Sequence, residues 1–319
     1  MAMKLTTGKR IAETSSKGNQ EKWRDGGRWY KLDLFGYEGL AETVASRLLE
    51  HTNLGELGFS FVPYRMEQLE VHRRKRTGCS SPDFLREGEA ILTLAELFRK
   101  GVGPNWQAQV SRLPNLASRV RWMADTTRQL TGLDRFGEYL TALFEADMLF
   151  GNEDRHLNNI AVLRRGGAFA YCPFFDFGAG LLSNTRDFPP DIVPKALVGQ
   201  LRAQPLGTLF ARQVHAAQRE FCPQLRWDFT AADVAAALEE ALPYYPQRDR
   251  GASPGQGGVV SEGAAEETSL LVKAEKEWQS APFPLRRGRV FAMLETETGK
   301  EARPCPAAIG FICSPPSPS

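Results

Sequence analysis

The 319-residue sequence lacks long apolar runs and any paired spacing of cysteines. No apolar run approaches the roughly 18 residues that a membrane-spanning helix needs, and the amino terminus carries no apolar signal core. The 5 cysteines are scattered, and an odd number without a framework favours reduced thiols. We therefore expect a cytoplasmic protein without membrane contact. Secretion by a route that needs no signal peptide remains an alternative.

The sequence also has few histidines and a small net charge. The chain has 4 histidines, of which His51, His72 and His215 stand alone, so a His-rich zinc site is not expected. Lys and Arg number 40 against 38 Asp and Glu, a net charge of +2, which predicts no direct nucleic-acid binding. Apolar types make up 42% of the residues, enough for a large core in one or two domains.

What the sequence does contain is a group of polar residues around a predicted hairpin. Asp154 is followed five positions later by Asn159. Two β-prone runs follow, 160–163 and 168–175, separated by a turn with a Gly-Gly pair. Asp176 comes directly after the second run, so a hairpin would bring it back beside Asn159.

These three residue types at this spacing are typical of phosphoryl transfer. In the protein kinase signature an Asp precedes an Asn by five residues, and a second Asp stands before Phe-Gly. The first acid orients the attacking hydroxyl or accepts its proton. The amide and the second acid offer the hard oxygen ligands that Mg²⁺ prefers. We therefore predict that Asp154 is the catalytic residue that orients the hydroxyl or accepts its proton, with Asn159 and Asp176 as metal ligands.

The order of residues around Asp154 distinguishes this chain from ordinary protein kinases. Ordinary protein kinases have His-Arg-Asp, whereas this chain has Asp154-Arg155-His156. Together with the run Pro173–Gly178, this motif resembles the HipA-like kinases, the CtkA-type bacterial kinases in particular. It is also similar to the pattern of phosphatidylinositol-kinase-related enzymes. The resemblance covers about residues 14–250 and implies use of ATP and Mg²⁺.

Two residues beside Asp154 have more than one interpretation. His156 either holds the loop, by bonding loop carbonyls or the Asp176 backbone, or contacts the γ-phosphate. The holding role is favoured. Arg155 either balances nearby acids or faces solvent.

A small polar segment near the amino terminus is a candidate phosphate-binding loop. Small residues let the backbone amides approach phosphates closely. The segment precedes a predicted strand, 28–33, whose central Lys31 would bind the phosphates. The predicted loop residues are Ser15, Ser16, Lys17, Gly18 and Asn19.

A helix that begins near Tyr37 should carry an acid that pairs with Lys31. Glu38 and Glu42 lie four residues apart on one face, and Glu38 is the favoured partner. The apolar stripe of this helix consists of Leu40, Val44, Leu48 and Leu49.

The remaining pattern predicts strands within 59–69 and helices farther along. The basic run 72–78 is expected to be a turn between strands, with a docking patch for an acidic partner as the alternative. The adenine-binding hinge is placed near 84–92, and Ser183 and Thr185 are candidate phosphorylation sites. Helices are predicted at 117–130, 136–149, 206–221 and 231–242, the last with a capping box of Thr230 and Asp233.

We predict an α+β, two-lobed, protein-kinase-like fold. A small β-rich lobe would span 1–85, a larger helical lobe 86–250, and a disordered tail 251–319. The resemblance implies transfer of the ATP γ-phosphoryl group to Ser or Thr of a protein substrate, with autophosphorylation and a regulatory protein partner left open. The alternatives are a phosphatidylinositol or small-molecule kinase of the same fold, and a nucleotide-binding regulator without turnover.

Overall fold

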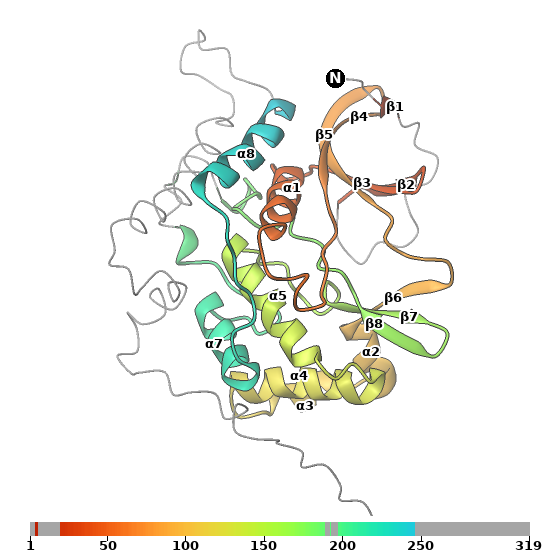
Figure 1. The fold of residues 1–319 in the computed structure, drawn as a ribbon, viewed down its shortest axis with the longest axis vertical. Helices are drawn as coiled ribbons and strands as arrows, with labels where there is room; N and C mark the ends of the chain where they lie inside the picture. The colour runs from red at the N-terminus through yellow and green to blue at the C-terminus, as the bar shows by residue number, and fades with distance from the viewer. Residues whose placement is uncertain (1–3, 6–19, 189–191, 193–196, 246–319) are drawn as a thin grey trace, which may run out of the picture. The chain divides into compact units, whose positions relative to one another are not determined.

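The computed structural model describes residues 4–5, 20–188, 192 and 197–245, drawn as the coloured ribbon in Figure 1. All of them belong to one compact unit of the chain, Met1–Ser280. The predicted phosphate loop at 15–19 and the predicted tail at 251–319 lie outside the described residues. The predicted lobe boundary at 85 stays a prediction. Among the described helices, none combines the length and the apolar character needed to cross a bilayer.

The first sheet holds five described strands in the order β1-β4-β5-β3-β2. β1 is parallel to β4, and the other neighbouring pairs are antiparallel. The strands are β1 Lys4–Leu5, β2 Lys22–Asp25, β3 Arg28–Leu32, β4 Arg65–Val71 and β5 Arg74–Pro82. Gly26 and Gly27 join β2 to β3 with φ of 54° and 73°, as the tight turn between antiparallel strands requires.

The basic run differs from its prediction. The turn between β4 and β5 consists of His72 and Arg73, whose φ values are 51° and 63°. β5 then begins at Arg74, so most of the predicted turn at 72–78 is strand, because its residues pair with β4 as far as Gly78 and beyond. The docking role of these basic residues stays a prediction.

Helix α1, Glu38–Leu49, is buried along almost its whole length. It contacts β4 and β5 on one side and α8 on the other, as Figure 1 shows. The predicted apolar stripe is confirmed, because its four members are at most 2% exposed. Packing on two sides also buries polar positions of the helix, among them Glu42 at 1% exposure.

The predicted hairpin is confirmed and belongs to a second sheet. Its strands β7, Ala161–Arg165, and β8, Ala168–Tyr171, are joined by a turn in which Gly166 has φ of 57°. A third strand, β6 Glu89–Thr93, pairs with β7 and was not predicted. Helix α2, Leu94–Gly101, begins directly after it, where Thr93 Oγ1 accepts a hydrogen bond from the Glu96 amide.

Four of the other helices lie close to the predicted positions, although one of them begins later than predicted, and the first and the last of the six were not predicted. They are α3 Trp106–Ser111, α4 Leu116–Thr131, α5 Phe136–Phe150, α7 Phe210–Phe221, α8 Ala231–Ala241 and the 3₁₀ helix η1 Leu242–Tyr244. The predicted start of α7 at residue 206 is wrong, because Ala203 and Thr208 close a turn through the Ala203 N–H and the Thr208 carbonyl. The capping box of Thr230 and Asp233 is confirmed.

One large hydrophobic core joins α1 to α2, α4, α5, α7 and α8. Helix α5 lies at its centre, with Phe136, Leu140 and Phe144 fully buried. The helix ends at Gly151, which has φ of 63° and caps it. This rigid helix end positions the loop that carries Asp154.

Candidate active site

Lys31 lies at the centre of the candidate site. It projects from β3, where its ammonium group donates to Glu42 Oε1 at 2.5 Å and to Asp176 Oδ1 at 2.6 Å. The side chain is 12% exposed, and its nitrogen lies 5.1 Å from the centre of the Tyr64 ring. One cation thus connects the first sheet, α1 and the segment that follows the hairpin.

The partner of Lys31 on α1 is Glu42, so the prediction of Glu38 is wrong. Glu38 instead accepts hydrogen bonds from the amides of Leu34, Phe35 and Gly36, just before the helix begins. A carboxylate at a helix start is the natural acceptor for these free amides. Glu42 Oε2 also accepts from the Phe177 amide at 2.8 Å, which ties α1 to the segment that carries Asp176.

Asp154 and Asn159 are brought together as predicted. Asn159 Nδ2 donates to the Asp154 carbonyl at 2.9 Å and to Asp154 Oδ2 at 3.3 Å. The Asn159 residue is 4% exposed, whereas the Asp154 side chain is 59% exposed. The amide is therefore fixed inside the loop, and the carboxylate faces outward, where an incoming hydroxyl could reach it.

Arg155, and not the side chain of His156, holds the loop that carries Asp154. Its guanidinium is fully buried and pairs with Asp147 of α5, with Nε–Oδ distances of 3.0 and 2.9 Å. It also donates to the Asn159 carbonyl at 3.0 Å and to the Phe175 carbonyl at 2.6 Å. One planar cation thus fastens the loop to α5 and to the residue before Asp176.

The His156 side chain makes none of the favoured contacts with described residues, although its backbone N–H donates to the Asp154 carbonyl. Its Nε2 lies 3.6 Å from Asp154 Oδ1, and its buried Nδ1 has no hydrogen-bond partner within the described part of the chain. The Asp176 carbonyl instead accepts from Asn152 Nδ2 at 3.3 Å. Asp176 has φ of 65°, a conformation that is costly for a residue with a side chain, and this contact helps hold it.

The charges of the site stabilise one another. Burial acts to raise the pKa of Asp176, but the Lys31 ammonium and its hydrogen bond outweigh it and lower that pKa to about 2. Burial acts to lower the pKa of Lys31, and the carboxylates of Asp176 and Glu42 raise it well above its usual value. Burial raises the pKa of Glu42 despite the Lys31 charge. Lys31 and Asp176 therefore stay ionised at neutral pH.

The pKa of Asp154, the outward-facing acid, is raised, whereas that of Asp176 is lowered. Partial burial raises the pKa of Asp154, and the negative charge of Asp176 adds to the effect, while His156 opposes it. A higher pKa makes this carboxylate a better proton acceptor than an isolated one.

Asn159 and Asp176 fit a magnesium ion. Asn159 uses its nitrogen for Asp154, and its oxygen accepts no hydrogen bond from a described residue. Asp176 uses Oδ1 for Lys31, which leaves Oδ2 available on a side chain that is 30% exposed. No cluster of three or more His, Cys, Asp or Glu suited to a metal occurs within the described ranges. Mg²⁺ bound with a nucleotide needs only one or two protein oxygens, since phosphates and water complete its shell.

Several residues that shape the site were missed from the sequence. Lys22 of β2 pairs in register with Lys31, and burial lowers its pKa, partly offset by the charge of Asp176. The register could have been derived, because a turn centred on Gly26 and Gly27 places position 22 opposite position 31. Asp147 and Asn152 gave no such signal, since their roles depend on the way α5 ends.

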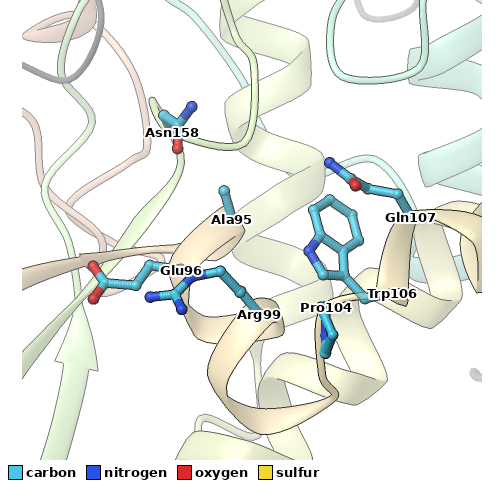
Figure 2. Close-up of a pocket in the computed structure, with 7 residues that line it drawn as sticks. All are labelled: Ala95, Glu96, Arg99, Pro104, Trp106, Gln107 and Asn158. Atoms are coloured by element: carbon cyan, nitrogen blue, oxygen red, sulfur yellow. The ribbon is translucent and has the colours of Figure 1, made fainter.

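A pocket of about 320 Å³ lies beside the loop that carries Asp154, between that loop, α2 and α3. Figure 2 shows Asn158, the residue before Asn159, on the loop side, with Glu96 and Arg99 projecting from α2. Trp106 of α3 forms an aromatic part of the wall. Its volume is at the lower end of the range typical of small-molecule sites.

No protein-family model matches this sequence, and no curated protein matches it. Solved structures do match the fold. The proinflammatory kinase CtkA of Helicobacter pylori is similar with a TM-score of 0.54 and 13% identity, over 82% of this chain and 89% of that one. A structure of HipA, HipB and operator DNA from Shewanella oneidensis is similar with a TM-score of 0.38 and 14% identity, over 84% of this chain and 65% of that one.

The likeness to CtkA extends over most of both chains, and at this identity it establishes the fold. It agrees with the order of the elements, in which a first sheet with α1 is followed by a largely helical part with a hairpin. The predicted resemblance is confirmed at this level: the chain has a two-lobed, protein-kinase-like α+β fold of the kind seen in CtkA.

Proposed function

We propose that the protein is an ATP-dependent kinase that transfers the γ-phosphoryl group to Ser or Thr hydroxyls of a protein. The observation that carries the proposal is the position of the Lys31 ammonium, 2.5 Å from Glu42 and 2.6 Å from Asp176. Phosphoryl transfer in protein kinases requires a strand lysine paired with a helix glutamate and a metal-binding acid before Phe-Gly, and this lysine contacts both acids.

Each residue has one task in this proposal. Lys31 binds the phosphates and is kept in place by Glu42. Asn159 and Asp176 would hold Mg²⁺, which neutralises charge on the transferring phosphoryl group when it is bound. Asp154 orients the acceptor hydroxyl and takes its proton. Arg155 maintains the distance between these groups, and catalysis would rest on that fixed geometry.

A polypeptide acceptor is favoured over a lipid or a small molecule. CtkA is described as a kinase, and this chain shares its fold. The pocket of about 320 Å³ beside Asn158 lies next to the loop that carries Asp154, where residues flanking an acceptor hydroxyl would lie. Autophosphorylation, the regulatory partner and the cytoplasmic location stay predictions.

The test is transfer of label from γ-labelled ATP with Mg²⁺, using a generic Ser/Thr protein substrate. We expect Asp154→Asn and Asp176→Asn to lower turnover by at least about a hundredfold, because each removes a charge at the reacting groups. Asp134→Asn is the matched control, since Asp134 is exposed and far along the chain from the site. Circular dichroism should show all three variants folded.

Different outcomes separate the alternatives. Equal labelling by the wild type and Asp154→Asn would contradict the assigned mechanism. Label on lipid vesicles but on no protein would favour the phosphatidylinositol-kinase alternative. Nucleotide binding without any transfer would favour a regulatory module.

A further inference from the structure

The connection between β3 and α1 is held by a buried acid outside the catalytic group. Asp33, two residues after Lys31, accepts a hydrogen bond from the Gly39 amide through Oδ1 at 2.6 Å. Its own amide donates to the Thr77 carbonyl of β5, and its carbonyl accepts from Arg76. The side chain therefore closes the six-residue path from β3 into α1.

The second oxygen of Asp33 reaches a residue from the far end of the described chain. Tyr245, which follows η1, donates its hydroxyl to Asp33 Oδ2 at 2.6 Å. The same hydroxyl accepts from the Leu40 amide at 3.2 Å, within the first turn of α1. Tyr245 is 8% exposed, and its ring lies 5.0 Å from that of Tyr37. One phenol thus joins the end of β3 to the start of α1.

Further contacts fix α8 and η1 to the same region. Thr77 of β5 donates to the Tyr244 carbonyl at 2.9 Å, and Arg47 of α1 pairs with Glu240 of α8 through two contacts of 2.9 Å. Helix α1 is consequently enclosed between the first sheet and α8. Any movement of α1 away from β3 must break the Asp33 and Tyr245 bonds.

The geometry leaves little freedom at this junction. A Cβ at Gly39 would lie 2.9 Å from Asp33 Oδ1 and 2.9 Å from the Gly78 carbonyl carbon, so the helix start is packed directly on β5. Glu42 follows one turn later and reaches Lys31 at 2.5 Å. A small rotation of α1 would therefore change the Lys31–Glu42 distance.

We infer that Asp33 and Tyr245 are positioning residues, through which the α8–η1 end of the fold keeps Glu42 against Lys31 and so keeps the site competent for phosphoryl transfer. The inference rests on the proposed function. Neither residue touches the reacting groups, and each acts through the placement of α1.

The environment of Asp33 gives this role a pH signature. Burial raises the pKa of Asp33 to about 7, while the hydrogen bond from Tyr245 acts to lower it. The charged and titratable groups that face Asp33 are Glu38 of α1, Arg76 and Cys79 of β5, and Tyr245. A protonated Asp33 can no longer accept both hydrogen bonds, so the link weakens as the pH falls through about 7.

The experiment compares Tyr245→Phe with Tyr244→Phe by kinetics over pH 5.5 to 9. Tyr244 is the matched control, because its hydroxyl has no hydrogen bond among the described residues while its carbonyl binds Thr77. Loss of one buried hydrogen bond should lower kcat/KM for ATP by roughly three- to tenfold. The KM for ATP should rise while the KM for the acceptor protein stays unchanged, whereas a smaller folded fraction would lower kcat and leave both KM values unchanged.

The pH profiles provide the specific readout. Tyr245→Phe should move the acidic limb of activity near pH 7 to higher pH, because the hydroxyl no longer stabilises the Asp33 carboxylate. Asp33→Asn should abolish that limb, and adding Tyr245→Phe to it should cause no further shift. If Tyr245→Phe and Tyr244→Phe match the wild type in both rate and profile, the inference is overturned while the proposed function stands.

Hydrogen exchange tests the link without any need for activity. Amides of α1, above all Leu40, should exchange faster in Tyr245→Phe than in Tyr244→Phe, and those of α4 should not change. If the wild type transfers no phosphate, the proposed function fails, and this comparison alone decides on the link. Equal exchange of α1 in the two variants would overturn it.

Discussion

At the scale of single residues, the candidate site depends on one buried cation more than on the acids around it. Arg155 contacts Asp147, Asn159 and Phe175, and both it and Asp147 are fully buried. Burial raises the pKa of Asp147, and the Arg155 charge and hydrogen bonds act against that rise. Removing either partner would leave an uncompensated charge in the interior.

We predict that Arg155→Met lowers the free energy of unfolding by about 3–5 kcal/mol, because Asp147 loses its cation. Urea denaturation at pH 7 measures this. Arg164→Met, at an exposed position of β7, should change the free energy by no more than about 0.5 kcal/mol. The double variant Arg155→Met with Asp147→Leu should recover part of the loss. Equal effects of Arg155→Met and Arg164→Met would contradict the scaffold role.

At the scale of helices and strands, acids bind elements to each other through free backbone amides. Glu38 does so before α1, and Glu145 of α5 does so after α7. Glu145 is 3% exposed and accepts from the Gln224 and Leu225 amides and from the Gln218 side chain. Burial raises its pKa to about 7 in spite of these hydrogen bonds.

This raised pKa predicts a loss of stability with rising pH. The folded protein holds the Glu145 proton more tightly than the unfolded chain, so the stabilisation is complete below about pH 4.5 and is lost as the pH rises through about 7. Glu145→Gln should remove up to about 3 kcal/mol of this pH dependence, an upper limit. Urea denaturation from pH 4.5 to 8 measures it, with exposed Glu239→Gln as control. An unchanged slope in Glu145→Gln would show that the carboxyl stays ionised.

At the scale of the whole molecule, the site draws on residues far apart in the sequence. β3 supplies Lys31, α1 supplies Glu42, and the loops on either side of the β7–β8 hairpin supply Asp154 and Asp176. A ligand that bridges these elements would therefore bind the folded chain and not the unfolded one. Such a ligand stabilises folding by mass action.

We predict that ATP with Mg²⁺ at 100 times its dissociation constant stabilises the protein by about 2.7 kcal/mol. Thermal unfolding should show a rise in Tm of several degrees for a chain of this size. At the same nucleotide concentration Lys31→Met should show a smaller rise, because it removes the phosphate-binding cation, whereas Asp134→Asn should match the wild type. An equal rise in Lys31→Met would exclude Lys31 as a nucleotide contact.

Much of the fold and part of the site follow from local patterns. The hairpin, the α1 stripe and the capping box at Thr230 depend on turn chemistry, helical period and neighbouring residues. The spacing of Asp154, Asn159 and Asp176 indicated their association because a hairpin returns the chain to its start. These features are set by contacts within a few tens of residues.

Which acid meets Lys31 was decided by the tertiary structure. Glu38 and Glu42 share a face of α1, so the sequence pattern alone allowed either to reach Lys31, and the prediction favoured Glu38. The free amides at residues 34–36 engage Glu38, and packing between β5 and α8 turns Glu42 toward Lys31. The exchange of roles between His156 and Arg155 has the same origin, since the end of α5 places Asp147 next to Arg155.

The sequence by itself thus determined most of the elements, their order and the residue types available for phosphoryl transfer, because propensity, period and turn chemistry act over short distances. Only the tertiary structure decided the Lys31–Glu42 pair, the Arg155–Asp147 pair and the link from Tyr245 to Asp33. Each of these contacts joins residues from different elements, and a buried charge or hydroxyl takes the partner that the packing of those elements brings within hydrogen-bonding distance.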